Sequence, residues 1–316
     1  MLWVVVAALA FDAVIGDPDW LWRRLPHPVT LIGWLIAMLD RAMNRETWSA
    51  SARRMTGTFT AILIVAVAAS AGVLIERLIG HGIVAIVIQG LLASVLIAQR
   101  SLYQHVARVR AAFAGSLNEA RSAVSMIVGR DPDALDEPAV CRAAIESCAE
   151  NFSDGVVAPL FWLALLGLPG LIAYKTINTA DSMIGHRNVR YEDFGWAAAR
   201  LDDLVNFVPA RLSGLLIALA APLANGSIWT SFKTTWRDAP RHRSPNAGWP
   251  ESAMAAALGL ALAGPRRYGD HVVDDVFLNA EGRQGAAPDD IGRALNVLIA
   301  TCALQAAIYM ALVIVV

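Results

Sequence analysis

Four polar tracts of this 316-residue chain contain the kinds of side chain that do chemistry. In the first tract, residues 146–155, the acids Glu146, Glu150 and Asp154 follow one another at i, i+4 and i+8. On a continuous helix this spacing puts three carboxylates on one stripe, where they repel one another. The tract runs directly into an apolar segment, so we expect a bound cation to neutralise the stripe.

The second tract, residues 174–211, is the richest in such groups. Lys175, Asn178 and Asp181 are three residues apart, so the first two share a helical face and Asp181 follows nearby. The same tract also contains Arg187, Arg200, Asp202, Asp203 and Asn206. The two remaining tracts are residues 237–254, with Arg241, His242, Arg243 and Asn246, and residues 16–33 near the N-terminus.

These residue types suit a phosphoryl-transfer site. Carboxylate and amide oxygens are ligands for Mg²⁺, which is usually shared with water and substrate phosphates, while Arg and Lys suit phosphate oxygens. An ATP-using ligase needs both sets, because they neutralise charge on the transferring group. The chain has neither a GxxxxGK[ST] loop nor a GxGxxG motif, so a nucleotide site here would be non-standard. For any single acid or arginine, a surface ion pair or a helix cap is an equal alternative.

Composition places the chain in the membrane class. Hydrophobic residues make up 56% and charged residues 17%, and mean hydropathy is +0.49; soluble domains carry about 25% charged residues. The net charge of −1 gives no reason to expect nucleic acid. Three cysteines without CxxC spacing argue against both a disulfide framework and a zinc site.

The elements that must position these residues are expected to be membrane helices. Residues 58–79 are long and apolar enough to cross about 30 Å of hydrocarbon, and residues 83–99 are marginal. Gly80-His81-Gly82 predicts a short turn between them, hence a helical hairpin. Further candidate spans are residues 204–224, which Pro209, Arg211 and Pro222 interrupt, and residues 291–316.

Two apolar segments do not fit a simple crossing. Leu168-Pro169-Gly170 breaks residues 156–174 in two, and residues 251–263 are too short to cross alone. Broken helices at membrane depth occur where protein or a watery cavity covers the freed backbone groups, as in transporter binding sites. We therefore predict an all-α, polytopic integral membrane protein with broken or re-entrant helices.

Arginine distribution gives the hairpin an orientation. Arginines cluster before residue 58 and again after residue 99, whereas the turn carries only His81. Both flanks therefore face the cytoplasm by the positive-inside rule. Residues 100–145 read as amphipathic helices on that side, since their apolar positions recur every three or four residues. We find no repeat or low-complexity linker, which favours a single domain over residues 1–316.

Together these tracts resemble one family, the cobalamin biosynthesis proteins CobD/CbiB, which are adenosylcobinamide-phosphate synthases. The matching stretches run in the family's order from residue 16 to about residue 269. The most specific of them are IESCAEN, YKTINTADSMIGH, ARLDDLVNFVPAR and SPNAGWPE. GDPDWLWRRLPHPVTLIG and GPRRYG stand at the two ends of the resemblance.

The resemblance implies a multi-pass protein of the bacterial inner (cytoplasmic) membrane. Such enzymes use ATP and Mg²⁺ to join adenosylcobyric acid to (R)-1-amino-2-propanol or its O-phosphate, giving adenosylcobinamide or its phosphate. Because a carboxylate is a poor acyl donor, we expect an acyl phosphate intermediate shielded from water in a membrane-edge cavity. Trp20, Trp22, Trp34 and Trp249 are candidates for packing on the corrin, with an interfacial aromatic belt as the equal alternative.

On this basis we assign roles to these residues as a hypothesis. Glu146, Glu150, Asp154 and Asp181 would hold Mg²⁺–ATP, and Asp202 or Asp203 would act as a further ligand or as the general base. Phosphates would be stabilised by Lys175, Arg187 and Arg200 and oriented by Asn151, Asn178 and Asn206. The aminopropanol phosphate or the corrin side chains would be held by Arg241, His242, Arg243 and Asn246.

Two other classes of function fit the same features. A transporter of a small solute or corrinoid would also need broken helices and polar groups at membrane depth. A structural or sensory membrane protein is the third alternative. The expected partners are the bilayer, ATP and the two substrates, with no nucleic acid; a homo-oligomer and other corrinoid-pathway enzymes are further candidates.

Overall fold

The computed structural model describes residues 1–128, 135–268, 271–273 and 275–315, and the chain divides into two compact units. Unit 1 contains residues 1–98, 158–206 and 312–316, and unit 2 contains residues 99–157 and 207–311. Neither unit is one continuous segment, because the chain leaves each unit and returns to it. The single domain expected over residues 1–316 stays a prediction.

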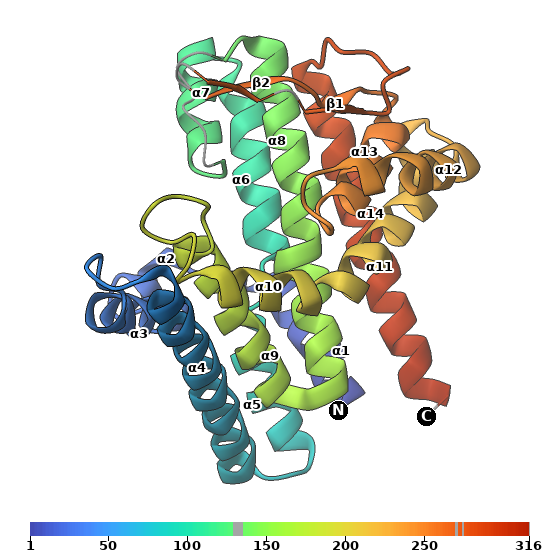
Figure 1. Ribbon diagram of the computed structural model, residues 1–316. Helices are drawn as coiled ribbons and strands as arrows, with labels where there is room; N and C mark the ends of the chain where they lie inside the picture. The colour runs from blue at the N-terminus through green and yellow to red at the C-terminus, as the bar shows by residue number, and fades with distance from the viewer. Residues whose placement is uncertain (129–134, 269–270, 274, 316) are drawn as a thin grey trace. The chain divides into compact units, whose positions relative to one another are not determined.

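Unit 1 is helical, with α4 and α9 packed along each other (Figure 1). Its helices are α1 (Leu2–Val14), α2 (Asp19–Trp22), α3 (Pro28–Met43), α4 (Ala50–Ile79), α5 (Ile83–Ser94), α9 (Ala158–Ile184) and α10 (Trp196–Val205). The predicted hairpin is confirmed: α4 ends at Gly80, and α5 begins after Gly82, both glycines having positive φ. The second arm ends at Ser94, earlier than the expected residue 99, and a new helix begins at Gln99.

Small residues on α4 allow the close packing within unit 1. A Cβ at Gly57 would lie 1.9 Å from the carbonyl oxygen of Phe194, and one at Gly72 would lie 2.5 Å from Cα of Pro169. Ile64 and Phe194 belong to a buried cluster that also contains Ile184 near the end of α9. This core holds the C-terminal part of α9, the loop after it and the start of α10 in one arrangement.

The predicted break in the apolar segment after residue 156 is confirmed inside α9. Gly167 has φ 68° and ψ −157°, so the chain leaves the helical conformation one residue before Leu168. Pro169 then stands in the first turn of the second half, where a missing N–H costs nothing. Glu76 of α4 accepts a hydrogen bond from the Leu168 N–H at 2.8 Å. A carboxylate thus caps the second half-helix, which carries Lys175, Asn178 and Asp181.

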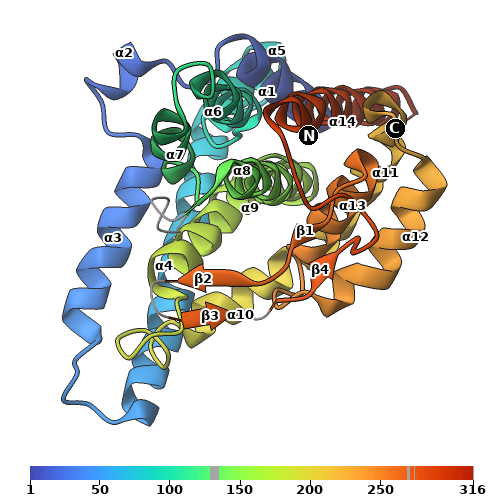
Figure 2. The same cartoon turned by 90° about the horizontal axis from the view of Figure 1, so that it is seen from above.

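Unit 2 contains the remaining helices and four short strands that the sequence did not predict. The helices are α6 (Gln99–Ala112), α7 (Leu117–Ser125), α8 (Glu137–Phe152), α11 (Phe207–Ala220), α12 (Ile228–Asp238), α13 (Gly248–Leu258) and α14 (Pro288–Val315), whose last residues belong to unit 1. A π-turn, Ser153–Val157, follows α8; 3₁₀ turns, Ala221–Ala224 and Ala239–Arg241, follow α11 and α12. The strands β1 (Leu262–Ala263) and β4 (Phe277–Leu278) form one antiparallel pair, and β2 (Arg266–Tyr268) and β3 (His271–Val273) form another (Figure 2).

Within unit 2, two of the sequence expectations concern α6 and α13. Leu102, Val106 and Val109 of α6 are buried, and the amphipathic character expected for this helix stays a prediction. The short apolar segment expected over residues 251–263 is α13, which is buried on nearly every side and ends at Gly259 with φ 69°. It is a core helix of unit 2, and the membrane re-entry suggested for it is not shown.

Five helical segments of the described residues are long and apolar enough to cross a membrane. They are Ala50–Ile79, Ile83–Ala112, Glu137–Ile184, Phe207–Ala224 and Pro288–Val315. On α4 the apolar side chains that do not face α9 are exposed, among them Phe59, Ile62 and Leu78. Exposed apolar surface of this extent is typical of a lipid-facing helix. The all-α, multi-pass fold class is therefore supported, with the small strand pairs as an addition.

Candidate functional site

The acidic stripe of the first tract does not continue as predicted. Glu146 is buried, and its carboxylate accepts the backbone N–H of Ala263 at 2.8 Å, whereas Glu150 is exposed. Asp154 lies in the π-turn, which changes the angle per residue and takes it out of α-helical register with the other two. Asn151 is exposed and donates to the Ser147 carbonyl one turn back. Only the first two acids therefore follow the predicted α-helical spacing.

No metal cluster is visible for the proposed ligands. Glu146, Glu150 and Asp154 belong to unit 2 and Asp181 to unit 1, so neither unit contains all four. In the part of the chain that the structure describes, no three His, Cys, Asp or Glu side chains gather as a metal-binding group. The assignment of these four residues to Mg²⁺ stays a prediction.

The third tract, at the end of α12 and before α13, is tightly cross-linked within unit 2. Arg241 lies 3.6 Å from the buried carboxylate of Asp238, and Arg243 lies 3.1 Å from Asp275. Nδ1 of His242 lies 3.0 Å from the Ser244 backbone nitrogen, and its Nε2 lies 3.7 Å from the Glu251 carboxylate. Both predicted phosphate-binding arginines are thus matched by acids of the same unit.

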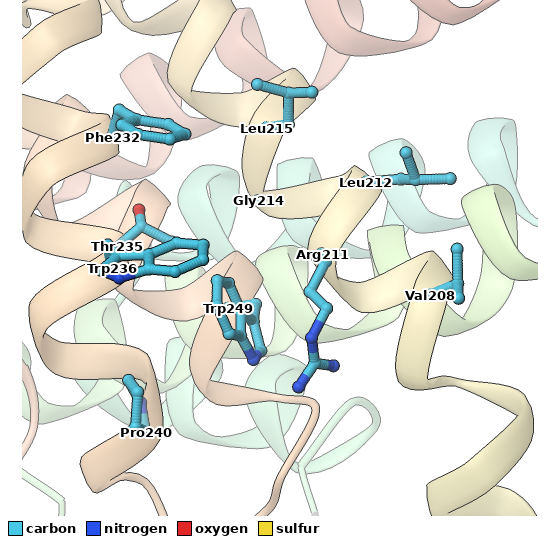
Figure 3. A pocket seen from close by; sticks show the side chains of 10 residues that line it. All are labelled: Val208, Arg211, Leu212, Gly214, Leu215, Phe232, Thr235, Trp236, Pro240 and Trp249. Carbon is cyan, nitrogen blue, oxygen red and sulfur yellow. The ribbon is translucent and has the colours of Figure 1, made fainter.

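An aromatic cavity of about 530 Å³ lies between α11, α12 and α13 of unit 2 (Figure 3). Phe232, Trp236 and Trp249 form its ring-lined side, and Leu212 and Leu215 of α11 form an aliphatic side. Arg211 is its one charged lining residue. Of these residues, only Trp249 was selected from the sequence, because an arginine or aromatic inside an apolar segment gives no spacing signal of its own.

The second tract brings most of its predicted residues together in unit 1. Nδ2 of Asn178 on α9 donates to Oδ1 of Asp202 on α10 at 3.3 Å. Asn206, just after α10, is buried, and its Oδ1 accepts the Tyr174 hydroxyl at 2.9 Å. Arg200 and Asp203 form an ion pair at 2.6 Å. Two neighbouring helices therefore present acids and amides to one another across a short gap.

The electrostatics of Asp202 stand out in this cluster. Burial and the nearby negative charge of Asp181 raise the pKa of the Asp202 carboxyl to about 7, although the hydrogen bond from Asn178 opposes the shift. A carboxyl with such a pKa exchanges a proton near neutral pH, as general bases do. A Cβ at Gly185 would lie 2.0 Å from Oδ1 of Asp181, so the glycine leaves room for this carboxylate. His186 and Arg187 follow on the exposed loop.

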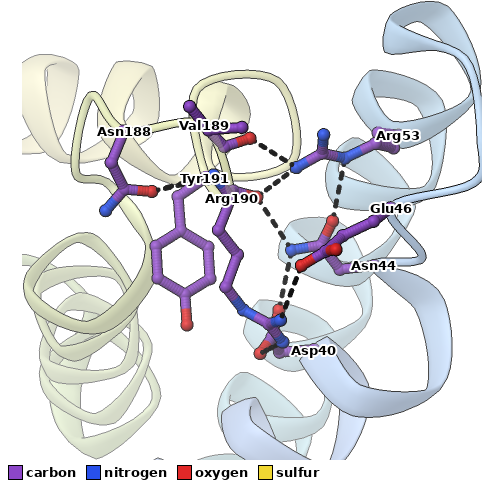
Figure 4. Close-up of polar contacts among 8 residues, drawn as sticks. All are labelled: Asp40, Asn44, Glu46, Arg53, Asn188, Val189, Arg190 and Tyr191. Carbon is purple, nitrogen blue, oxygen red and sulfur yellow. Dashed lines mark hydrogen bonds and ion pairs between the residues drawn. The ribbon is translucent and has the colours of Figure 1, made fainter.

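A polar clamp holds that loop in place (Figure 4). Arg53 of α4 donates to the carbonyl oxygens of Val189, at 3.1 Å, and of Arg190, while its Nε donates to Asn44 at 3.0 Å. Asp40 is buried and pairs with the Arg190 guanidinium at 2.7 Å. Sequence reasoning missed Asp40, Asn44 and Arg53, since their partners lie more than a hundred residues away in the chain.

The fourth tract serves mainly to start α3. The ring of His27 accepts the Val29 N–H at 3.2 Å and so caps the helix, and Asp17 lies 3.6 Å from the same ring. Trp22 packs edge-on against His27, with ring centroids 4.5 Å apart. Trp20 and Trp34 are exposed. These contacts explain the tract as local structure.

Comparison with known families gives a match over most of the chain. The model of the family described as "CobD/Cbib protein" matches residues 5–298, which is most of the chain. The chain belongs to the CobD/CbiB family. A CobD/CbiB relative from Sinorhizobium sp., named cobalamin biosynthesis protein CobD, is 50% identical over 316 residues, covering 99% of this chain and 98% of its own.

Two further CobD/CbiB relatives carry the same name. The protein of Brucella suis is 48% identical and covers 98% of this chain and 95% of its own. That of Rhodobacter capsulatus is 49% identical, with 92% and 91% covered. No solved structure matches the chain.

Proposed function

We propose that the chain is an ATP-dependent amide ligase of cobalamin biosynthesis in the bacterial inner membrane. It would join adenosylcobyric acid to (R)-1-amino-2-propanol or its O-phosphate. The observation that carries the proposal is the α9–α10 cluster of unit 1, where Asp202, with a pKa of about 7, lies beside Asn178 and close to Asp181. The names of the relatives support the pathway.

The reaction needs an activated carboxylate. An oxygen of the corrinoid propionate attacks the γ-phosphorus of ATP, ADP leaves, and an acyl phosphate forms. The amine nitrogen then attacks the acyl carbon, and the C–O bond to phosphate breaks as the amide C–N bond forms. Ionised Asp202 takes the proton that the attacking ammonium must lose, which a carboxylate with a pKa near 7 can do.

The donor set of unit 1 fits Mg²⁺ bound together with nucleotide. The Asp181 carboxylate, with the Asn178 amide one turn before it on α9, matches the few protein ligands that Mg²⁺ takes when phosphates and water supply the rest. Asp202 stays outside this ligand set and serves as the base. When bound, the ion would neutralise charge on the phosphate oxygens. Lys175 and Arg187 would add positive charge.

The test is turnover by the purified full chain. Release of ADP should require both adenosylcobyric acid and the amine, and Asp202→Asn should lower kcat roughly 100-fold and remove the rise in rate through about pH 7. Lys175→Ala and Glu150→Gln test the phosphate and metal assignments, and Glu192→Gln, an exposed acid of unit 1, is the matched control. Full activity of Asp202→Asn and Lys175→Ala would refute this site.

Two outcomes would point elsewhere. AMP and pyrophosphate as products would replace the acyl phosphate with an acyl adenylate. Counterflow of a corrinoid into liposomes without ATP would favour the transporter, which the broken helix α9 also suits.

A further inference from the structure

Three rings follow one another along α12, and the last two of them, Phe232 and Trp236, line the aromatic cavity of unit 2. Trp229, Phe232 and Trp236 follow one another along α12 with centroids 6.4 Å apart and planes inclined by 22° and 24°. Trp236 then meets Trp249 of α13 edge-on at 5.6 Å. The cavity is thus lined on this side by Phe232, Trp236 and Trp249, while Trp229 lies outside the lining (Figure 3).

Helix α12 places these rings outward by turning its polar residues inward. Ser231 donates to the Ala253 carbonyl at 2.9 Å, and Thr235 donates to the Ser231 carbonyl at 2.7 Å. Both hydroxyl groups are buried, while Trp236 remains 67% exposed. A helix that buries its hydroxyls and exposes its rings is built to meet an apolar partner on the ring side.

Among the described residues that line this cavity, Arg211 is the one cation. Its Cζ lies over the Phe207 ring, 3.5 Å from the centroid, and over the Trp249 ring at 4.6 Å. Nη1 donates to the Phe207 carbonyl and to Oδ1 of Asn246, which leaves Nε and Nη2 without a protein acceptor. Among the described residues no carboxylate lies within ion-pair distance of Arg211, unlike Arg241 and Arg243 nearby in the chain.

These features specify a ligand with an apolar face and a carboxylate or other anion at its edge. A guanidinium that is already fixed by stacking and two hydrogen bonds presents its remaining N–H groups at little entropic cost. Ring faces favour a flat conjugated partner over a flexible chain. The apolar cavity and single unmatched cation therefore suit a flat ring system carrying one carboxylate.

We propose that this cavity is a corrinoid subsite, in which Arg211 binds the carboxylate of cobyric acid and Trp236 and Trp249 pack on the edge of the corrin. The assignment rests on the function proposed above, which supplies a substrate with one free carboxylate among amides. It adds Arg211 and Trp236 to Trp249, which was already a candidate from the sequence. Arg211 and Trp249 both lie in stretches that carry the family resemblance, ARLDDLVNFVPAR and SPNAGWPE.

Direct binding tests the subsite without relying on turnover. Dicyanocobyric acid absorbs where tryptophan emits, so its binding to the full chain in nanodiscs is followed by quenching of tryptophan emission. Arg211→Gln should weaken binding about tenfold or more, because a charge-assisted hydrogen bond is lost. It should leave the Kd of dicyanocobinamide, which lacks the carboxylate, nearly unchanged. Arg211→Lys should recover part of the loss.

Matched variants separate the cavity from its surroundings. Lys233→Gln removes an exposed cation of α12 that does not line the cavity, and Trp229→Leu removes the outermost ring. Both should bind cobyric acid normally, whereas Trp236→Leu should weaken both corrinoids equally. Size-exclusion profiles establish that each variant is folded. If Arg211→Gln does not fold, the binding of dicyanocobyric acid and dicyanocobinamide is compared in Arg211→Lys instead.

Two results would overturn the subsite. One is an unchanged Kd for cobyric acid in Arg211→Gln and Trp236→Leu. The other is stronger quenching of Trp236 and Trp249 by brominated phospholipid that cobyric acid does not relieve, which would make the cavity a lipid site. Cobyric acid binding through Arg211 in a chain without ligase activity would retain the subsite and reject the proposed reaction. Normal turnover by Arg211→Gln would retain the proposed reaction and reject the subsite.

Discussion

At the scale of single residues, the raised pKa of Asp202 makes the folding stability of the chain depend on pH. Burial and the charge of Asp181 raise its pKa to about 7. An unfolded aspartate titrates near pH 3.9. Between these values the folded chain keeps a proton that the unfolded chain has lost, so the stability due to this group is full below the unfolded pKa and is lost as pH rises to about 7.

Asp202→Asn should therefore stabilise the chain at alkaline pH. We expect its advantage over the parent to grow from near zero at about pH 4 to about 1–3 kcal/mol at pH 8, because the amide cannot ionise. Thermal unfolding in detergent across this range measures the effect, with Glu192→Gln as a control for losing an exposed acid. A constant difference at every pH would contradict the raised pKa.

At the scale of elements, the broken helix α9 is the feature that most depends on a partner. The backbone leaves helical geometry at Gly167, and the N–H of Leu168 would be costly to leave without an acceptor inside a membrane protein. Glu76 supplies that acceptor from α4. The break in α9 therefore depends on α4, because a side chain of α4 caps the second half of α9.

Glu76→Ala should destabilise unit 1 by about 1–2 kcal/mol, the usual cost of losing an N-terminal cap. Glu76→Gln keeps an acceptor and should lose less. Thermal unfolding measures both, and Arg77→Ala, the exposed neighbour on the same turn, is the control. If Glu76→Ala were as stable as Arg77→Ala, the cap would not contribute to the break.

At the scale of the whole molecule, the chain has five segments that can cross a membrane among its described residues, and two units interleaved along the sequence. The α4–α5 hairpin is the segment whose orientation can be argued from charge. Arginines stand on both of its flanks and none in its turn. The positive-inside rule therefore predicts that both flanks face the cytoplasm.

Single cysteines test that orientation. After replacement of Cys141, Cys148 and Cys302, a cysteine at His81 should react with a membrane-impermeant maleimide in intact cells. Cysteines at Trp48 and Gln104, both at exposed positions, should react only after permeabilisation. The expected contrast in labelling is at least about tenfold. Equal labelling at all three positions would reject the hairpin.

Features that depend on neighbours along the chain were predictable from the sequence. The α4–α5 hairpin with its glycine turn and the break before Pro169 each follow from local rules of length and backbone geometry. The family followed from long specific stretches of sequence. The prediction of a stripe of three acids was wrong at Asp154. A π-helical turn, which has no clear local sequence signal, changes the helical register there.

The partners of each side chain were decided by tertiary structure alone. Glu146 meets a backbone N–H 117 residues away, Arg53 meets carbonyl groups 136 and 137 residues away, and Asn178 meets Asp202 across two helices. Periodicity can place a residue on a face, but what covers that face depends on how distant segments pack. The sequence therefore predicted which residue types would do chemistry, and packing determined which of them lie together.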